Sequence, residues 1–402
     1  MRIVYFYQYF STPNGSWGTR VYDFCKEWVA QGHDVTVVTS VYAKSDLKAT
    51  RLIEDQVFDG IKVKVLNIRI DNKQPVFQRI WTFIQYSLLS SYYAITLKAD
   101  LVIASSGPIT AGLPGLVARY IRRRPLIFEV RDLWPDGAIE LGIIKNPMLR
   151  KLAYWLEKQC YRASRFVITL SPGMSTDIRT RFPWVSVDDV PNAADIKLFS
   201  TRNDLQEIQL PARSYAIYTG NIGKVNHSTW LFEAARILRE KGRNDIYMLL
   251  IGDGQLKASL KEKAAAAGLK NFIIMDPIPK VELVKYVQSS IASLVPLMKS
   301  KVLDTSSPNK LFESLAAGVP VVQTSNGWIN DLINEYQVGY TIDPNDPLSL
   351  AECLIELKDN PSIGASMGVR SYSLAVDQFD KKKLAHKMLG HLLKVHQMND
   401  CL

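Results

Sequence analysis

The chain has 402 residues, 47% of them hydrophobic, and a formal net charge of +10 at pH 7. This length exceeds the roughly 250 to 300 residues that one hydrophobic core holds, so two domains are expected. The four cysteines form no Cys-x-x-Cys pair, which indicates neither a disulfide framework nor a zinc site and fits a reducing cytoplasm. The positive charge favours an anionic partner: nucleic acid, acidic lipid or a phosphate-bearing substrate.

The first half of the chain alternates short apolar runs with amphipathic segments, a pattern typical of parallel βα units. Its N-terminal segment lacks a signal-peptide cleavage site and is interpreted as a buried strand, so no export is expected. Strands are predicted at 2–7, 35–39, 61–66, 101–104, 126–130 and 166–170. Helices are predicted at 18–31, 76–97, 109–121 and 147–163.

One of these helices contains an uncharged segment, 80–97, which is just long enough to span a bilayer. Its serine, threonine and glutamine residues argue against lipid on all sides, whereas Trp81, Tyr86 and Tyr92 suit a membrane interface. Three interpretations stay open: a buried or interdomain helix, a helix on the membrane surface, and a transmembrane span.

The second half repeats the βα pattern after a polar stretch, 191–213, that is interpreted as a linker. Strands are predicted at 215–219, 247–251, 272–275, 292–297, 319–323 and 339–342, with helices between them. A final helix follows, in which Leu384, Met388, Leu392 and Val395 recur at helical spacing among several lysines.

These elements predict an α/β protein with two doubly wound, Rossmann-like domains that face each other across a cleft. The first domain is placed at 1–195 and the second at 205–375. The final helix, from about 376 to 402, is expected to pack back on the first domain, with a membrane-contacting tail as the alternative. In open α/β sheets, ligands bind at the carboxyl ends of the strands, so the loops there are the candidate sites.

A glycine-containing loop follows the first strand and leads into a helix. Its candidate donor-binding residues are Gly15, Ser16, Trp17, Gly18 and Arg20. Glycines allow close backbone approach, and a helix N-terminus presents free N–H groups and a positive dipole to an anion. The spacing is not the dinucleotide fingerprint, so a plain turn is the alternative.

The second domain opens with a similar device, in which Gly220, Asn221 and Gly223 precede Lys224. The lysine places a cation where a phosphate would lie, although a solvated lysine on a turn explains it as well.

The strongest local signal is the segment 305–313. Ser307 is expected to cap a helix and Pro308 to open it, which puts Lys310 in the first turn. A lysine there opposes the helix dipole unless a diphosphate lies between them, and Glu313 one turn later suits ribose hydroxyls. The assigned donor-binding residues are Thr305, Ser307, Pro308, Asn309, Leu311 and Glu313, whereas Lys310 and Lys224 are assigned to catalysis. The alternative is a capped core helix with surface Lys and Glu.

Two further strand ends carry polar residues. Ser105 and Ser106, with Trp134 and Asp136, are assigned to the acceptor. Arg131 and Asp132 are assigned to catalysis, because an arginine beside carboxylates and a tryptophan suits a carbohydrate or phosphate site. An internal ion pair of Arg131 with Asp132 or Asp136 would explain the same residues equally well.

No metal cofactor is expected. No two aspartates stand two residues apart, so the Asp-x-Asp metal clamp is missing, and the five histidines lack metal-ligand spacing.

Together, these motifs resemble the family 4 retaining glycosyltransferases of the GT-B fold. The likeness rests on FEVRDLWP at 128–135, LSPG at 170–173, VPN at 190–192, TGNIG at 219–223 and PNKLFE at 308–313. The first and last of these resemble the fucosamine-transferase-like branch that assembles bacterial O-antigen and capsule repeats.

The resemblance implies that the loop Gly15 to Gly18 faces a donor diphosphate, which Lys224 and Lys310 neutralise, while Glu313 holds the ribose. It implies a UDP-linked N-acetylhexosamine or deoxy derivative as donor and a lipid-linked, polyprenyl diphosphate acceptor, with no nucleic acid. The argument for the acceptor is also electrostatic, because a lipid-linked diphosphate lies at an anionic surface that attracts lysine and arginine. A cytoplasmic enzyme on the anionic membrane surface is therefore expected, with candidate contacts at 120–124, at 381–383 and in the aromatic helix around Trp81. Two positions depart from the family pattern: Thr305 replaces a frequent glutamate, and Arg131 a frequent histidine.

Two other classes of function stay open. A nucleotide-sugar epimerase of the same architecture would need a carboxylate or histidine acid–base pair. A non-catalytic basic adaptor would need a contiguous basic face with stacking aromatics, whereas these cations are dispersed among loops.

Overall fold

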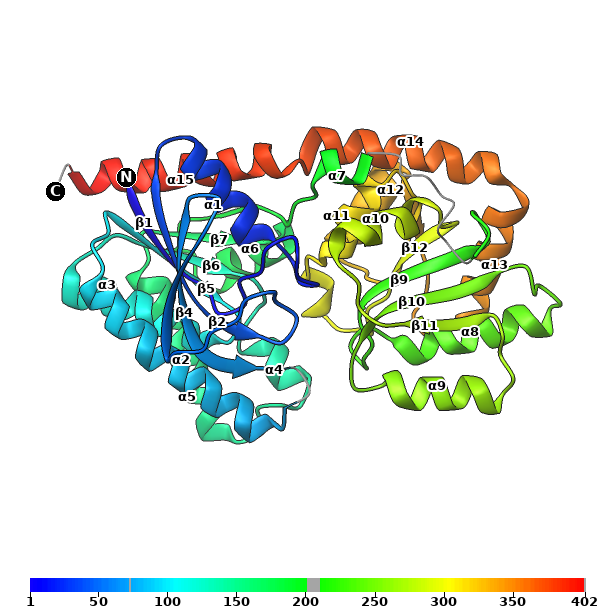
Figure 1. Cartoon of the computed structure of the whole chain (residues 1–402), viewed down its shortest axis with the longest axis horizontal. Coiled ribbons are helices and arrows are strands. Elements are labelled where there is room, and N and C mark those ends of the chain that lie inside the picture. Colours follow the sequence, from blue (N-terminus) through cyan, green and yellow to red (C-terminus); the bar gives the residue numbers. More distant parts are fainter. Residues whose placement is uncertain (72–73, 201–209, 401–402) are drawn as a thin grey trace. The chain divides into compact units, whose positions relative to one another are not determined.

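The computed structural model describes residues 1–71, 74–200 and 210–400 (Figure 1). The chain forms two compact units, each with its own sheet. The first unit consists of Met1–Pro191, the short segment Thr305–Ser307 and the C-terminal segment from Lys381. The second consists of Asn192–Asp304 and Pro308–Asp380.

The sheet of the first unit has eight strands in the order β3-β4-β2-β1-β5-β6-β7-β8. Their bounds are β1 Arg2–Phe6, β2 Asp34–Tyr42, β3 Ile53–Phe58, β4 Ile61–Ile70, β5 Leu101–Ser106, β6 Leu126–Val130, β7 Phe166–Thr169 and β8 Val187–Asp189. Every pair is parallel except the antiparallel pair β3–β4. Strands β5 and β6 are buried along their whole length, as expected for a parallel sheet covered on both faces.

Helices cover both faces of this sheet. They are α1 Arg20–Ala30, α2 Val76–Thr96, η1 Ile109–Gly112, α3 Leu113–Arg122, α4 Asp136–Glu140, α5 Pro147–Ala163, α6 Pro172–Arg181 and α15 Lys381–Asp400. α3 contacts both α2 and α5, and these three helices lie below the sheet in the view of Figure 1. Among the described residues, no helix has the length and apolar character needed to cross a membrane.

The second unit has six parallel strands in the order β11-β10-β9-β12-β13-β14. They are β9 Tyr215–Asn221, β10 Tyr247–Asp253, β11 Phe272–Met275, β12 Ala292–Val295, β13 Val321–Gln323 and β14 Gly339–Thr341. The helices are α7 Ile196–Ser200, α8 Ser228–Glu240, α9 Lys257–Ala266, α10 Lys280–Gln288, α11 Asn309–Ala316, α12 Trp328–Tyr336, α13 Pro347–Asp359 and α14 Pro361–Gln378. The short helix η3, Leu303–Thr305, begins in this unit and its last residue belongs to the first. The strand order is the 3-2-1-4-5-6 order of doubly wound sheets. The predicted pair of Rossmann-like domains is therefore confirmed.

The C-terminal helix α15 packs against α1 of the first unit (Figure 1). Trp28 Nε1 of α1 donates a hydrogen bond to the Ala385 carbonyl oxygen of α15 at 3.0 Å. The predicted apolar stripe is buried: Leu384, Met388, Leu392 and Val395. The helix begins at Lys381 rather than near 376, because α14 continues to Gln378 and Phe379 then packs on Phe312.

We predict that Leu392→Ala will lower the free energy of unfolding by about 2 to 5 kcal/mol, because it leaves a cavity where a fully buried side chain stood. The neighbouring Leu393→Ala is the matched control, since Leu392 is 0% exposed and Leu393 is 37% exposed. Its cost should stay below about 1 kcal/mol. Urea unfolding measures both, and equal effects would mean that α15 does not dock through this stripe.

Candidate functional site

Strand order reverses beside one strand of each sheet. In the first unit β1 lies between β2 and β5, and in the second β9 lies between β10 and β12. Ligands of open α/β sheets bind at such points, outside the carboxyl ends of the strands. The predicted site segments follow β1, β5, β6, β9 and β12, so the topology brings them to the carboxyl edges of the two sheets.

Glu129, near the end of β6, is the centre of a buried cluster at the edge of the first sheet. Its side chain is 0% exposed. Its Oε1 accepts a hydrogen bond from Arg20 Nε at 3.0 Å. Its Oε2 accepts from the hydroxyls of Tyr5 at 2.7 Å and Ser105 at 2.6 Å. Ser105, predicted to bind acceptor, therefore lies inside the fold and bonds a carboxylate.

The charges of this cluster are balanced within the unit. Burial alone would raise the pKa of Glu129, but Arg20 and Arg131 outweigh it and hold that pKa below its usual value. Arg20 also donates to the Pro191 carbonyl oxygen and is buried. The prediction that Arg20 contacts the donor is not supported by this position, because its guanidinium is enclosed by the core.

Arg131 and Asp132 follow β6 directly. The Arg131 guanidinium lies 4.7 Å from the centre of the Tyr7 ring, and its backbone N–H donates to Ser106 Oγ at 3.1 Å. Asp132 is an exposed residue. The protein atoms around it nevertheless raise the pKa of its carboxyl to about 6 by desolvation, although Arg131 opposes this shift. Trp134 is half-buried two residues later.

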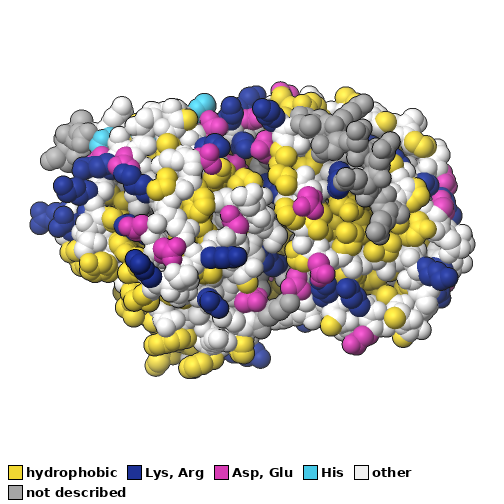
Figure 2. Space-filling view, viewed as in Figure 1, with side chains coloured by type: hydrophobic (Ala, Val, Ile, Leu, Met, Phe, Trp, Pro, Cys, Tyr) yellow, Lys and Arg dark blue, Asp and Glu magenta, His cyan; other side chains and the backbone are white. Residues whose placement is uncertain are grey.

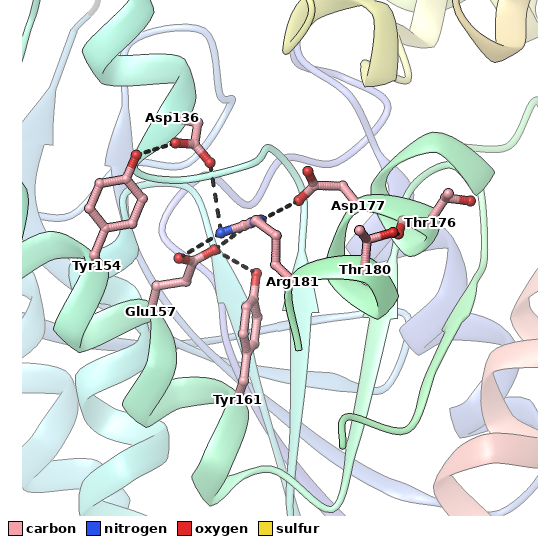
Figure 3. A network of polar contacts seen from close by, with 8 residues as sticks. All are labelled: Asp136, Tyr154, Glu157, Tyr161, Thr176, Asp177, Thr180 and Arg181. Carbon is pink, nitrogen blue, oxygen red and sulfur yellow. Dashed lines mark hydrogen bonds and ion pairs between the residues drawn. The ribbon is translucent and has the colours of Figure 1, made fainter. Parts of the chain in front are cut away.

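A second polar network joins α4, α5 and α6 around Arg181 (Figure 3). Its members are Asp136, Tyr154, Glu157, Tyr161, Thr176, Asp177, Thr180 and Arg181. Arg181 lies 2.8 Å from buried Glu157, 2.7 Å from Asp177 and 3.8 Å from Asp136. Asp136 also accepts a hydrogen bond from the Tyr154 hydroxyl. The Arg131–Asp136 pair left open by the sequence is not the pairing found, and Asp136 contributes to internal packing.

The predicted glycine loop after β1 is tightly packed. A Cβ atom at Gly15 would lie 2.2 Å from Ser11 Oγ and 3.1 Å from the Lys44 carbonyl oxygen, so a side chain there would force its neighbours to shift. The exposed Ser16 donates its N–H to the Lys44 carbonyl oxygen at 3.0 Å. The Trp17 ring packs edge-on against Tyr42 at 5.0 Å, and Gly18 is half-buried.

The N-terminus of α1 is less open to an anion than predicted. Asp23 stands in its first turn and accepts a hydrogen bond from Thr19 Oγ1 at 2.6 Å. The same carboxylate pairs with Lys381 at 3.1 Å. Because a negative side chain already complements the helix dipole, an added phosphate would meet an existing carboxylate.

In the second unit, Lys310 lies against the end of β9. Its Nζ is 4.0 Å from the centre of the Tyr218 ring and 3.4 Å from Asn226 Oδ1. A Cβ atom at Gly220 would stand 3.6 Å from this Nζ, and Gly220 has φ +128°, which disfavours any side chain. The structure thus brings together the two segments that the sequence assigned to a diphosphate.

The glycine segment itself differs from the prediction in one respect. Gly220 and Asn221 belong to β9, so the loop before α8 is shorter than expected. Gly223 donates its N–H to Ser228 Oγ at 3.0 Å. Lys224 follows with an exposed side chain on the turn before α8.

Helix α11 begins one residue later than predicted. Pro308 is its N-cap residue, and no side chain makes a capping hydrogen bond, so the prediction that Ser307 caps the helix is wrong. The first turn holds no acidic residue. Asn309 is half-buried, whereas the Leu311 side chain is fully buried in the core, which leaves no side-chain surface there for a donor.

Glu313 has a partner that sequence analysis missed. Lys280 Nζ lies 2.9 Å from Glu313 Oε1, and only about a tenth of either side chain is exposed, at 10% and 12%. Lys280 opens α10 directly after Pro279, so it lies in the first turn of a helix that follows a proline, as Lys310 does. Thr305 belongs to the first unit, where its carbonyl oxygen accepts from Ser171 Oγ at 2.5 Å. Across the described residues, no three His, Cys, Asp or Glu side chains are grouped as a metal site.

The sequence is similar to those of known proteins. A family model described as "Glycosyl transferase 4-like domain" matches residues 15–193, and "Glycosyl transferases group 1" matches 213–360. CapM of Staphylococcus aureus, a capsular polysaccharide biosynthesis glycosyltransferase, is 25% identical over 77% of this chain and 81% of its own length. WbjE of Pseudomonas aeruginosa, a probable glycosyltransferase, is 21% identical over 65% of this chain, which spans 66% of that relative.

Solved structures show the same fold. Sucrose-phosphate synthase from Thermosynechococcus elongatus superposes with a TM-score of 0.77 at 16% identity, covering 100% of both chains. Anabaena HepE in complex with UDP-glucose gives 0.71 at 15% identity, covering 98% of this chain and 100% of that one. With two family models that together take in most of the sequence and a paired Rossmann-like architecture, the chain belongs to the group 1, family 4-like glycosyltransferases of the GT-B fold.

Proposed function

We propose that this protein transfers a sugar from a UDP-sugar to a lipid-linked saccharide during synthesis of a bacterial surface glycan, O-antigen or capsule, with retention at the anomeric carbon. The observation that carries the proposal is the position of Lys310 against Gly220, at the switch point of a doubly wound sheet. HepE in complex with UDP-glucose, and an E. coli trehalose-6-phosphate protein with UDP-2-fluoro glucose, support a UDP donor.

The chemistry needs stabilisation of the departing diphosphate. The bond from the anomeric carbon to the β-phosphate oxygen breaks, its electron pair stays on the diphosphate, and the acceptor hydroxyl oxygen bonds to that carbon. Lys310, Lys224 and the uncapped N–H groups of α11 would stabilise the new charge without a metal. The leaving phosphate would take the acceptor proton. Glu313, which pairs with Lys280, would accept hydrogen bonds from ribose hydroxyls.

The acceptor side is assigned to the carboxyl edge of the first sheet. Arg131, held over Tyr7, and Asp132 carry the catalytic role, and Trp134 offers a face for a sugar ring. Ser105 and Asp136 act by positioning, since both bond within the fold. Of the carboxylates on which an epimerase would depend, Glu129 and Asp136 are engaged internally, which disfavours that alternative.

The names of several relatives support the substrate class. AmsK of Erwinia amylovora is an amylovoran biosynthesis glycosyltransferase, and CapM acts in capsular polysaccharide synthesis. Two other relatives are named for N-acetylglucosaminyl transfer, each matching 42% of this chain. An N-acetylhexosamine donor, an acceptor carried on polyprenyl diphosphate and a cytoplasmic site on the inner face of the membrane complete the proposal.

Lys310→Ala should lower kcat/KM for UDP release from the cognate UDP-sugar by about 10²- to 10³-fold, because a transition-state charge loses its partner. Lys224→Ala tests the second cation in the same way. Lys241→Ala is the control, since Lys241 pairs with Glu352 on the surface of the same unit. Mass-spectrometric detection of UDP gives the rates, with EDTA present in a parallel series. Full turnover in both Lys310→Ala and Lys224→Ala, or loss of wild-type activity in EDTA, contradicts the assignment.

The pH dependence tests Asp132. Its carboxyl, with a pKa of about 6, is charged above that pH and neutral below it. If the charged form orients the acceptor, kcat/KM should fall about tenfold per pH unit below 6. Asp132→Asn should have a low kcat/KM that does not fall further below pH 6. Glu140→Gln, which removes an exposed carboxylate on α4, should keep the wild-type fall. If the kcat/KM of Asp132→Asn falls below pH 6 as in the wild type, the titrating group is a different one.

A further inference from the structure

A basic pocket lies at the amino edge of the first sheet, at the opposite ends of the strands from the proposed active edge. It has a volume of about 480 Å³ and is lined by Arg2, Lys98, Ile121, Arg122, Arg123 and Arg124. Arg2 opens β1 and Lys98 precedes β5, whereas Arg122 ends α3 and the other two arginines lie between α3 and β6. Because β1, β5 and β6 are parallel neighbours, their amino ends bring these cations together.

The positive charge of this pocket is only partly compensated. Arg2 is paired with Asp100, whose Oδ1 accepts from Arg2 Nε at 3.0 Å. Arg124 is buried and donates to the Ala94 carbonyl oxygen at 3.0 Å. In the described part of the chain, no acidic side chain forms an ion pair with Lys98, Arg122 or Arg123. Three cations therefore face a concavity that offers them one carboxylate, already occupied.

The cations that line the pocket also repel one another. The pKa of Arg124 is lowered, first by burial and then by the neighbouring charges of Arg122 and Arg2. Cations at the carboxyl end of a helix are favourable in themselves, which accounts for Arg122 at the end of α3. It does not account for Arg2 and Lys98, which come from other segments. A bound anion would relieve the repulsion among all of them.

An exposed apolar face borders this pocket. On α2 it consists of Phe77, Ile80, Trp81, Ile84, Leu88, Tyr92 and Ile95, whose exposed fractions range from 37% to 83%. They recur every three or four residues and so share one side of the helix. α2 ends two residues before Lys98, and Tyr120 and Ile121 add exposed surface at the end of α3. Hydrophobic side chains gather along this part of the molecule in Figure 2.

We propose that the basic pocket binds the phosphate groups of anionic lipids while the apolar side of α2 lies in the headgroup region of the same bilayer. Arginines match phosphate geometry, and tryptophan and tyrosine favour the membrane interface. A 21-residue helix is about 30 Å long, enough to lie along the surface as an anchor. The choice of lipid over free phosphate rests on the proposed function only through its lipid-linked acceptor; the apolar face argues for it independently.

The test is partitioning of the full-length protein onto vesicles of phosphatidylcholine with phosphatidylglycerol. Arg122→Ala combined with Arg123→Ala should weaken partitioning roughly 25-fold, since each basic side chain near an anionic surface contributes about a factor of five. Lys261→Ala with Lys263→Ala, which removes the same charge from the exposed side of α9, should change it less than twofold. Equal losses in the two double variants would show that partitioning depends on net charge alone, and would contradict the proposal that the basic pocket binds lipid phosphates.

Two further arms separate the alternatives. If the protein binds inorganic phosphate in calorimetric titration through Arg122 and Arg123 but does not bind vesicles, the pocket is a site for free phosphate and the lipid proposal is contradicted. Binding to RNA in place of vesicles would contradict it too. Trp81→Gln with Leu88→Gln should reduce vesicle binding that persists at high salt, and retention of that binding overturns the role of α2. Sugar transfer to a water-soluble acceptor analogue should be unchanged in all of these variants, so failure of docking and failure of the proposed enzymatic function give different results.

Discussion

The organisation of the first unit depends on one buried ion pair, Arg20 with Glu129. The carboxylate lies near the end of β6, and its partners come from α1, β1 and β5, so four separate elements meet at one charged group. Removing one partner of such a pair typically costs about 3 to 5 kcal/mol, because a charge is left in the core. The pair therefore fixes the carboxyl edge of the sheet, and Arg131, two residues beyond Glu129, inherits its position from it.

In the second unit, the charged group that is held in a fixed position is a single cation. Lys310 stands in the first turn of α11, where the helix dipole disfavours a positive charge by about 0.3 to 1 kcal/mol. The Tyr218 ring, 4.0 Å from Nζ, offsets this by a cation–π contact of similar size. The ammonium is thus held in place before any ligand arrives. A preorganised cation of this kind is what a leaving diphosphate needs, since no rearrangement is required when its charge develops.

Sequence patterns predicted the architecture well and the side-chain partners poorly. Each predicted strand exists, because buried parallel strands are continuous apolar runs. β3 escaped detection because its polar residues sit on an edge strand, and β8 because Val-Asp-Asp is too short to carry a period. The sequence marked Arg20, Asp136 and Glu313 as polar residues at strand or helix ends. It could not reveal that Glu129, Arg181 and Lys280 are their partners, since each pair joins segments distant along the chain.

The structure also shows how the net charge of +10 is distributed, which composition alone does not reveal. Many cations are neutralised locally, as in Arg243 with Asp245 and Asp359, and contribute little to recognition. Other cations lie at the two proposed binding sites, Lys310 beside Gly220 in the second unit and Lys98, Arg122 and Arg123 in the basic pocket of the first. Within the first unit, α2 begins after β4 at the carboxyl edge and ends beside the pocket at the amino edge. A bilayer bound along α2 would therefore reach from one edge of that sheet to the other. A lipid-borne acceptor would then approach Arg131 and Asp132 from the membrane side, without competing with the phosphates that hold the protein there.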